Sequence, residues 1–185
     1  MYFKSLNRSF FVQIGRGTLY VKCFENGNWL KTKTDVGISD DYRVKSIQVI
    51  SSSVDTNGWM QEEFSKKIDP LNHPRGVIIS DFEVFEMTLR AVLRKLTDKW
   101  YVTTAIFIMN LDYEPEGGIT EIERRAIRDS AEHCGAKEVY IISKRFNYDE
   151  TILEELYSLL ISASGKSSKR RPKLVSESNF SKLLE

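Results

Sequence analysis

The feature that most constrains the fold is a pair of short apolar runs, each of which follows an amphipathic segment. The runs are TTAIFIM at residues 103–109 and VYII at residues 139–142. A short apolar run of this kind predicts a strand that is covered on both faces of its sheet. Strands that alternate with helices form parallel sheets with helices on their faces. The second half of the chain is therefore expected to be an α/β layered domain.

The helix before the first run is predicted from apolar residues that recur between Phe82 and Leu96 at three- and four-residue spacing. Ser80 or Asp81 is placed to cap its start. A third amphipathic helix is expected after the second run, over Thr151–Ser162.

The helix between the two runs lies in GGITEIERRAIRDSAEHCGAKEVYII, residues 117–142. Thr120 and Glu123 have the spacing of a capping box, and Gly135 is placed to end the helix. The apolar stripe expected to face the core consists of Ile122, Ala126, Ile127 and Ala131.

The first half of the chain is rich in strand signals. Two runs of aromatic and β-branched residues, 10–14 and 18–24, are separated by Gly-Arg-Gly, which predicts a hairpin. A third strand is expected over 29–34. Residues 36–75 have poor periodicity apart from a short strand around 46–52, and they are interpreted as an insertion outside the core.

The expected element order is therefore a three-strand meander, an insertion, and then helix, strand, helix, strand, helix. This is the order found in ribonuclease-H-like folds. We expect one domain over residues 1–164, with the insertion at about 36–75, followed by a basic linker and docking tail over 165–185.

Composition excludes several classes of function. Lys plus Arg (27) nearly cancels Asp plus Glu (26), so no nucleic-acid partner is expected. No segment approaches the roughly 20 apolar residues that span a bilayer, and the chain is expected to be cytoplasmic, with peripheral attachment to the inner face of the membrane left open. The two cysteines lack metal-ligand spacing and are interpreted as reduced, buried thiols.

Three stretches resemble MreB, the bacterial actin-like family of rod-shape determination. They are HPRGVIISDFEVFEMTLRAVLRKL, the stretch GGITEIERRAIRDSAEHCGAKEVYII described above, and FFVQIGRGTLYVK, which lies where the family has its first phosphate-binding hairpin. The likeness is strong over residues 74–142 and fair over 10–24. It implies an actin-like domain, limited to the first large subdomain with a reduced insertion. The family's second phosphate loop and adenosine pocket have no counterpart in this sequence.

The resemblance also implies which residues would belong to a nucleotide site. Gln13 stands where the family has an aspartate that helps hold magnesium, and Gly15 and Gly17 match the phosphate-binding turn. Glu123 is matched to the glutamate that positions the attacking water. A neutral amide does not offset the charge of Mg²⁺, and Glu123 is explained by capping alone. We therefore expect these residues to be remnants, with neither ATP nor magnesium bound and no catalysis.

Other catalytic templates are weaker. The two histidines have no metal-ligand spacing. Asp112, Glu114 and Glu116 form an acidic loop that resembles the metal cluster of a ribonuclease-H-like nuclease, but they lie on one connection and are expected to be solvated.

The leading functional hypothesis is a non-catalytic protein-binding module of a cytoskeletal, cell-shape or envelope-associated complex. The partner is expected to be a full-length MreB-type filament or membrane-associated machinery, and a homodimer is also open. The alternative is an ATPase half-site that a partner chain completes, and the third reading is a divergent nuclease. Residues 1–10 could bind a membrane weakly. The tail could dock into a partner groove through Phe180, Leu183 and Leu184.

Overall fold

The computed structural model describes seven stretches of the 185-residue chain. These are residues 8–40, 43–57, 65–71, 77–97, 104–115, 117–142 and 150–164. Most of the N-terminal segment, His73 and the whole tail, with Phe180, Leu183 and Leu184, lie outside the described residues. The expectations placed on those segments remain predictions.

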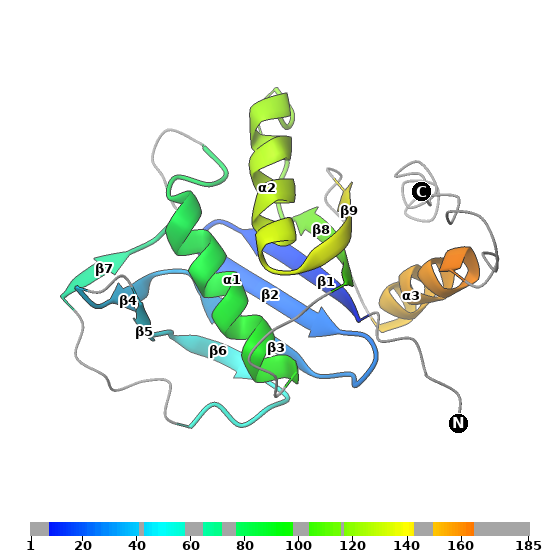
Figure 1. Cartoon of the computed structure of the whole chain (residues 1–185), viewed down its shortest axis with the longest axis horizontal. Coiled ribbons are helices and arrows are strands. Elements are labelled where there is room, and N and C mark those ends of the chain that lie inside the picture. Colours follow the sequence, from blue (N-terminus) through cyan, green and yellow to red (C-terminus); the bar gives the residue numbers. More distant parts are fainter. Residues whose placement is uncertain are drawn as a thin grey trace.

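A six-stranded sheet forms the centre of the molecule, with strand order β6-β3-β2-β1-β8-β9 (Figure 1). The strands are β1 (Ser9–Gly15), β2 (Thr18–Cys23), β3 (Trp29–Lys33), β6 (Val49–Ser52), β8 (Ala105–Leu111) and β9 (Ala136–Ile142). The first four of these pair antiparallel, whereas β1 with β8 and β8 with β9 pair parallel. The meander followed by parallel strands is therefore confirmed.

Three helices cover this sheet: α1 (Phe82–Thr97), α2 (Glu121–His133) and α3 (Glu150–Ser164). α1 and α2 pack on one face, where the core includes Phe10, Leu89, Phe107 and Ile127. The other face packs on Leu153 and Leu156 of α3, and its core includes Phe11 and Ile108. Successive strand residues thus enter cores on opposite sides, as the period of two requires.

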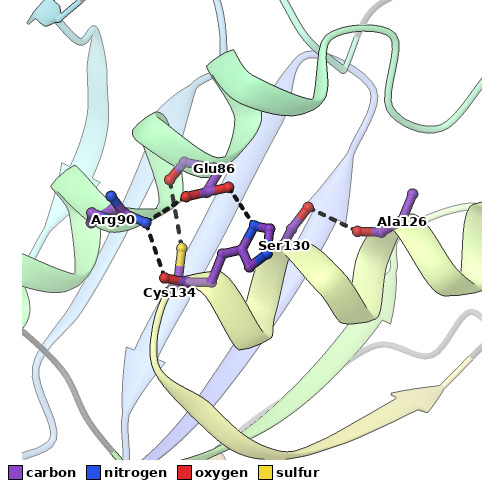
Figure 2. Close-up of polar contacts among 6 residues, drawn as sticks. Glu86, Arg90, Ala126, Ser130 and Cys134 are labelled. Atoms are coloured by element: carbon purple, nitrogen blue, oxygen red, sulfur yellow. Dashed lines mark hydrogen bonds and ion pairs between the residues drawn. The ribbon is translucent and has the colours of Figure 1, made fainter.

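A polar junction joins α1 to the end of α2 (Figure 2). Arg90 forms an ion pair with Glu86 and donates a hydrogen bond of 3.0 Å to the backbone oxygen of His133. Nδ1 of His133 lies 2.9 Å from the same Glu86 carboxylate, and the Cys134 thiol donates to the Glu86 backbone oxygen. The bond from Arg90 thus satisfies the His133 carbonyl at the end of α2, where no helical partner follows.

Residues 36–75 are only partly the insertion that the sequence indicated. A small sheet, β5-β4-β7, is formed by β4 (Val36–Ile38), β5 (Val44–Ser46) and β7 (Lys66–Ile68). The short strand expected around 46–52 is confirmed as β6, but its assignment to the insertion is wrong, because β6 extends the main sheet. The expectation that this segment lies outside the core is also wrong for several residues. Val36, Ile38 and Ile47 are buried against Val84 of α1, and Leu71 belongs to the main core.

The helix boundaries follow the local signals closely. Asp81 is the residue that caps α1, since its side chain accepts a 3.0 Å hydrogen bond from the backbone N–H of Val84. One prediction for α2 is wrong: Ile122 is 82% exposed instead of buried. The reason is that α2 packs on the sheet through its second half, where Ile127, Ser130 and Ala131 are buried, and its first turn projects past the core.

Candidate functional site

The candidate site lies at the carboxyl ends of β1 and β8, on the face of the sheet that α3 covers. Gln13 and Asn110 are paired neighbours on these parallel strands. Gln13 follows Phe11 at a spacing of two residues, and Asn110 follows Ile108 in the same way, so both amides share the face of those two core residues. Ligands of open α/β sheets commonly bind at the carboxyl ends of their strands.

The two amides are buried and bonded to each other. Gln13 is 6% exposed and Asn110 is 1% exposed. The Gln13 side-chain NH₂ donates a 3.3 Å hydrogen bond to Oδ1 of Asn110, and the Asn110 NH₂ donates a 3.2 Å bond to the backbone oxygen of Ile142. The pair thus links β1, β8 and β9 and supplies partners for polar groups that water does not reach.

The hairpin after β1 forms the rim of this site. Gly17 has a φ of +70°, which favours glycine, and a Cβ on Gly15 would lie 2.4 Å from the hydroxyl oxygen of Thr18. The same Cβ would lie 3.4 Å from Oδ2 of Asp112, an exposed residue that follows β8. Both glycines are therefore explained by the tight turn, whether or not a phosphate binds there.

The floor of the site does not fit a magnesium ion. Mg²⁺ in proteins takes near-octahedral oxygen ligands that include carboxylates or phosphates, and it retains several waters. Gln13 and Asn110 provide neutral amides, and both groups of Asn110 are already hydrogen-bonded, to Gln13 and to β9. Among the described residues, no group of three or more His, Cys, Asp or Glu side chains could hold a metal ion.

Glu123 lies away from this floor. It lies in the first turn of α2, a helix that packs on the opposite face of the sheet, and the capping box predicted for it is confirmed. Its Oε2 accepts hydrogen bonds of 3.0 and 2.7 Å from the backbone N–H and the hydroxyl of Thr120, and its Oε1 accepts a 3.4 Å bond from the backbone N–H of Ile78. The structure therefore places Gln13 and Gly15 on β1 and Glu123 on α2, a helix of the opposite face.

A cation–π contact joins the hairpin to the segment that follows β8. The guanidinium carbon of Arg16 lies 5.0 Å from the centre of the Tyr113 ring. Burial raises the pKa of the Tyr113 hydroxyl, while Arg16 lowers it and Glu123 raises it. Tyr113 therefore lies near both charges and joins the hairpin to the start of α2.

Sequence reasoning missed Asn110 and the contact between Arg16 and Tyr113. Asn110 had one available signal, because it is the polar residue that directly follows the apolar run 103–109. Asp112 and Glu114 of the acidic loop are exposed to solvent, as expected. Glu116 lies outside the described residues.

The cysteines do not supply a nucleophile. Both are unpaired and buried, as the sequence indicated. Burial raises the pKa of the Cys23 thiol to about 11 and that of the Cys134 thiol to about 12. Because the thiolate is the reactive form, neither side chain is activated near neutral pH.

Comparisons with known proteins agree with this architecture. The family model described as MreB/Mbl protein matches residues 44–147, which is more than half of the chain. Among solved structures, MreB5 of Spiroplasma citri bound to ADP aligns with a TM-score of 0.50 at 15% identity. The alignment covers 74% of this chain and 38% of that one.

A second structure of MreB5 from Spiroplasma citri, bound to AMPPNP, aligns with a TM-score of 0.49 at 16% identity, over 73% of this chain and 38% of that one. The chain thus spans less than two-fifths of the length of these MreB5 chains. No curated protein matches the sequence. No helix in the described part of the chain is long and apolar enough to cross a membrane.

The family match and the actin-like arrangement of strands and helices lead to one conclusion: the chain belongs to the MreB/Mbl family.

Proposed function

We propose that this chain is a non-catalytic MreB/Mbl protein that acts by binding another protein of a cytoskeletal or envelope-associated complex. The observation that carries the proposal is the buried pair of Gln13 and Asn110 at the ends of β1 and β8. Catalysis of phosphoryl transfer depends on charged groups and metal ions preorganised around the phosphates. At this position the chain instead has two neutral amides that stabilise the sheet.

The position of Glu123 supports the same proposal. A residue that positions an attacking water needs an oxygen available to that water. The capping box and the N–H of Ile78 provide partners for both oxygens of Glu123. We therefore interpret Glu123 as a structural residue that fixes the start of α2 and the approach to α1.

Titration of the intact chain with ATP and Mg²⁺ in a calorimeter, together with a phosphate-release assay, tests the absence of catalysis. We expect no heat of binding at micromolar nucleotide and no turnover above a blank. Magnesium-dependent binding of ATP, or turnover that the Gln13→Leu variant abolishes, would contradict the proposal.

Co-sedimentation with filaments of a full-length MreB tests the proposed partner. We expect the chain in the pellet only when filaments are present, and bovine albumin serves as the protein control. Failure to sediment across a range of filament concentrations would count against a filament partner. Pull-down with the intact chain would then test membrane-associated machinery, and the same bait lacking residues 165–185 would test docking by Phe180, Leu183 and Leu184.

A second candidate, an ATPase half-site completed by another chain, is favoured by one observation. The Asp112 carboxylate lies at the rim beside Gly15, where it could reach a ligand that the hairpin contacts. Under this candidate a partner would co-purify only with ATP present, and Asp112→Asn would abolish that dependence. Co-purification that is indifferent to ATP would leave the protein-binding module as the better account.

A further inference from the structure

β6 is the outermost strand of the main sheet, and its outer side is available for pairing. Among the described strands it pairs with β3 alone, and β9 forms the opposite edge of the sheet (Figure 1). The N–H of Ser53 bonds to the backbone oxygen of Trp29, so Ser52, the residue before it, directs both of its backbone groups away from β3. β6 therefore offers a backbone donor and a backbone acceptor to an added strand.

β6 lacks the charge that every other edge strand of the two described sheets carries. The other edge strands are β5, β7 and β9, and each of them contains at least one lysine. Residues 46–54, SIQVISSSV, contain no charged residue and no proline. Natural proteins commonly protect an edge strand with charge, proline or a bulge, because an unprotected edge pairs with other chains. The register shift of β6 lies opposite Lys31 and Thr32, and it leaves the pairing of Ser52 with Leu30 regular.

An exposed apolar side chain lies on the same strand. Val49 packs against the main core, and Ile50, the next residue, is directed to the other side of the sheet. Ile50 is 48% exposed, so it contributes little to the core of its own chain. It is available to cover an apolar side chain of an added strand.

The strand behind β6 supplies positive charge on the side to which Ile50 is directed. Lys31 and Lys33 of β3 are two residues apart and therefore share one side of the sheet, and Lys31 is the paired neighbour of Ser51. Lys33 is exposed and Lys31 is half-buried. No ion pair joins either lysine to another residue that the structure describes.

The chain places little negative charge beside these lysines. Residues 26–34 and 43–54, which include β3 and β6, contain no aspartate or glutamate. Asp35 and Asp55 follow these two stretches directly, and Asp35 already forms an ion pair with Lys67. A ligand of this edge is therefore expected to bring acidic groups of its own.

These features fit an extended acidic segment of another protein. A strand added to β6 would lie about 10 Å from β3, and a lysine and a glutamate side chain together bridge that distance. In such a contact the backbone bonds supply affinity, and alternate side chains supply specificity. A second copy of this chain fits poorly, because its β6 brings no acidic residue and its Lys31 and Lys33 would add like charge to the contact.

We infer that the outer edge of β6 binds an extended acidic segment of a partner protein by strand addition, and that Lys31 and Lys33 select its acidic side chains. The inference rests on the proposed function, and it names the surface and the chemistry through which the chain binds its partner.

Fluorescence anisotropy with the intact chain tests this edge with a defined probe, a labelled peptide in which valine and glutamate alternate. We expect saturable binding that salt weakens, and binding about tenfold weaker when lysine replaces glutamate in the peptide. The valine–glutamate peptide methylated on its backbone nitrogens cannot donate to a strand and should not bind. Equal binding of the methylated peptide, or no binding of the probe, overturns the inference.

Substitutions in the chain locate the contact. Ser52→Pro deletes an N–H that points outward, where an edge strand tolerates proline, and it should weaken binding by about tenfold or more. Ser52→Ala keeps that N–H and should bind as the wild type does. Lys31→Glu should weaken binding by about tenfold, whereas the matched control Lys137→Glu, on the opposite edge strand β9, should not. Equal effects of Lys31→Glu and Lys137→Glu overturn the inference.

Hydrogen exchange of the Ser52 amide, followed by NMR, distinguishes other occupants of the edge. We expect fast exchange in the free chain and slow exchange once the valine–glutamate peptide is added. Protection in the free chain that grows with protein concentration would mean that copies pair through this edge. Protection that does not depend on concentration would mean that the chain covers its own edge, and either result overturns the inference.

The peptide assay and the filament assay fail separately. Filament co-sedimentation without peptide binding, unchanged by Ser52→Pro, overturns this inference and leaves the proposed function in place. Peptide binding by a chain that sediments with no filament supports the β6 edge and counts against a filament partner.

Discussion

The two faces of the main sheet differ in what their polar residues do at the ends of the strands. On the face covered by α1 and α2, the core is apolar, and Thr120 and Glu123 form the capping box at the start of α2. On the face covered by α3, two amides are buried in the sheet itself, at Gln13 and Asn110. The first arrangement is what folding requires of any α/β domain. The second lies where the family resemblance places a charged nucleotide site, and the proposed absence of catalysis rests on it.

The largest loss of stability should come from the face covered by α1 and α2, which we call the apolar face. Phe107 is fully buried and meets Phe10 edge-on, with ring centres 5.2 Å apart. Phe107→Ala should lower the free energy of unfolding by about 3–5 kcal/mol, because it removes an aromatic side chain and leaves a cavity. Urea denaturation measures this change.

Leu153→Ala is the variant to compare with Phe107→Ala, because it truncates a core side chain on the face covered by α3. Leu153 is 1% exposed, and its truncation should cost about 2–5 kcal/mol. A loss below about 1 kcal/mol for Phe107→Ala would mean that the apolar face is not the main core.

The amide pair should give the next largest effect and a distinctive pattern. Asn110→Leu leaves the Gln13 amide and the Ile142 carbonyl without their partner, so it should cost about 1–3 kcal/mol. Gln13→Leu should cost a similar amount. The double variant should cost less than the two losses added together, because no amide is then left unpaired. Urea denaturation of all four proteins completes the cycle, and strict additivity would show that the two amides act independently.

The two faces also differ in how far the sequence predicts them. The capping box, the glycine that ends α2 and the apolar helix stripes depend on residues a few positions apart, so local patterns reveal them. The pairing of Gln13 with Asn110 spans 97 positions and depends on strand register, which no local pattern supplies. Gln13 was singled out only through the family resemblance, and Asn110 was missed.

Local pattern also failed where tertiary packing decides burial. Ile122 fits the helical stripe of α2, but the helix starts beyond the core and the side chain points to solvent. Sequence pattern does not assign β6 to the main sheet, because β4 and β5 of the small sheet lie between it and its partner β3 in the chain. Its register with β3 also shifts at Lys31, which weakens any simple alternation.

The capping box provides a smaller test on the α1 and α2 face. Thr120→Ala removes the acceptor of the Glu123 N–H, at 3.2 Å, and the donor to the Glu123 carboxylate. We expect a loss of about 1 kcal/mol in the free energy of unfolding. Thr120→Ser keeps the hydroxyl and should recover most of it. If serine and alanine destabilised the protein equally, the hydroxyl would not be the capping group.

The smallest expected change in stability comes from Ile122, and its small size is informative. The side chain is 82% exposed, so Ile122→Ser should alter the free energy of unfolding by less than about 0.5 kcal/mol. A side chain whose truncation leaves the free energy of unfolding unchanged belongs to the surface and not to the core. Urea denaturation measures this change. A loss above about 1 kcal/mol would mean that Ile122 packs within its own chain, and the apolar face would then extend over the first turn of α2.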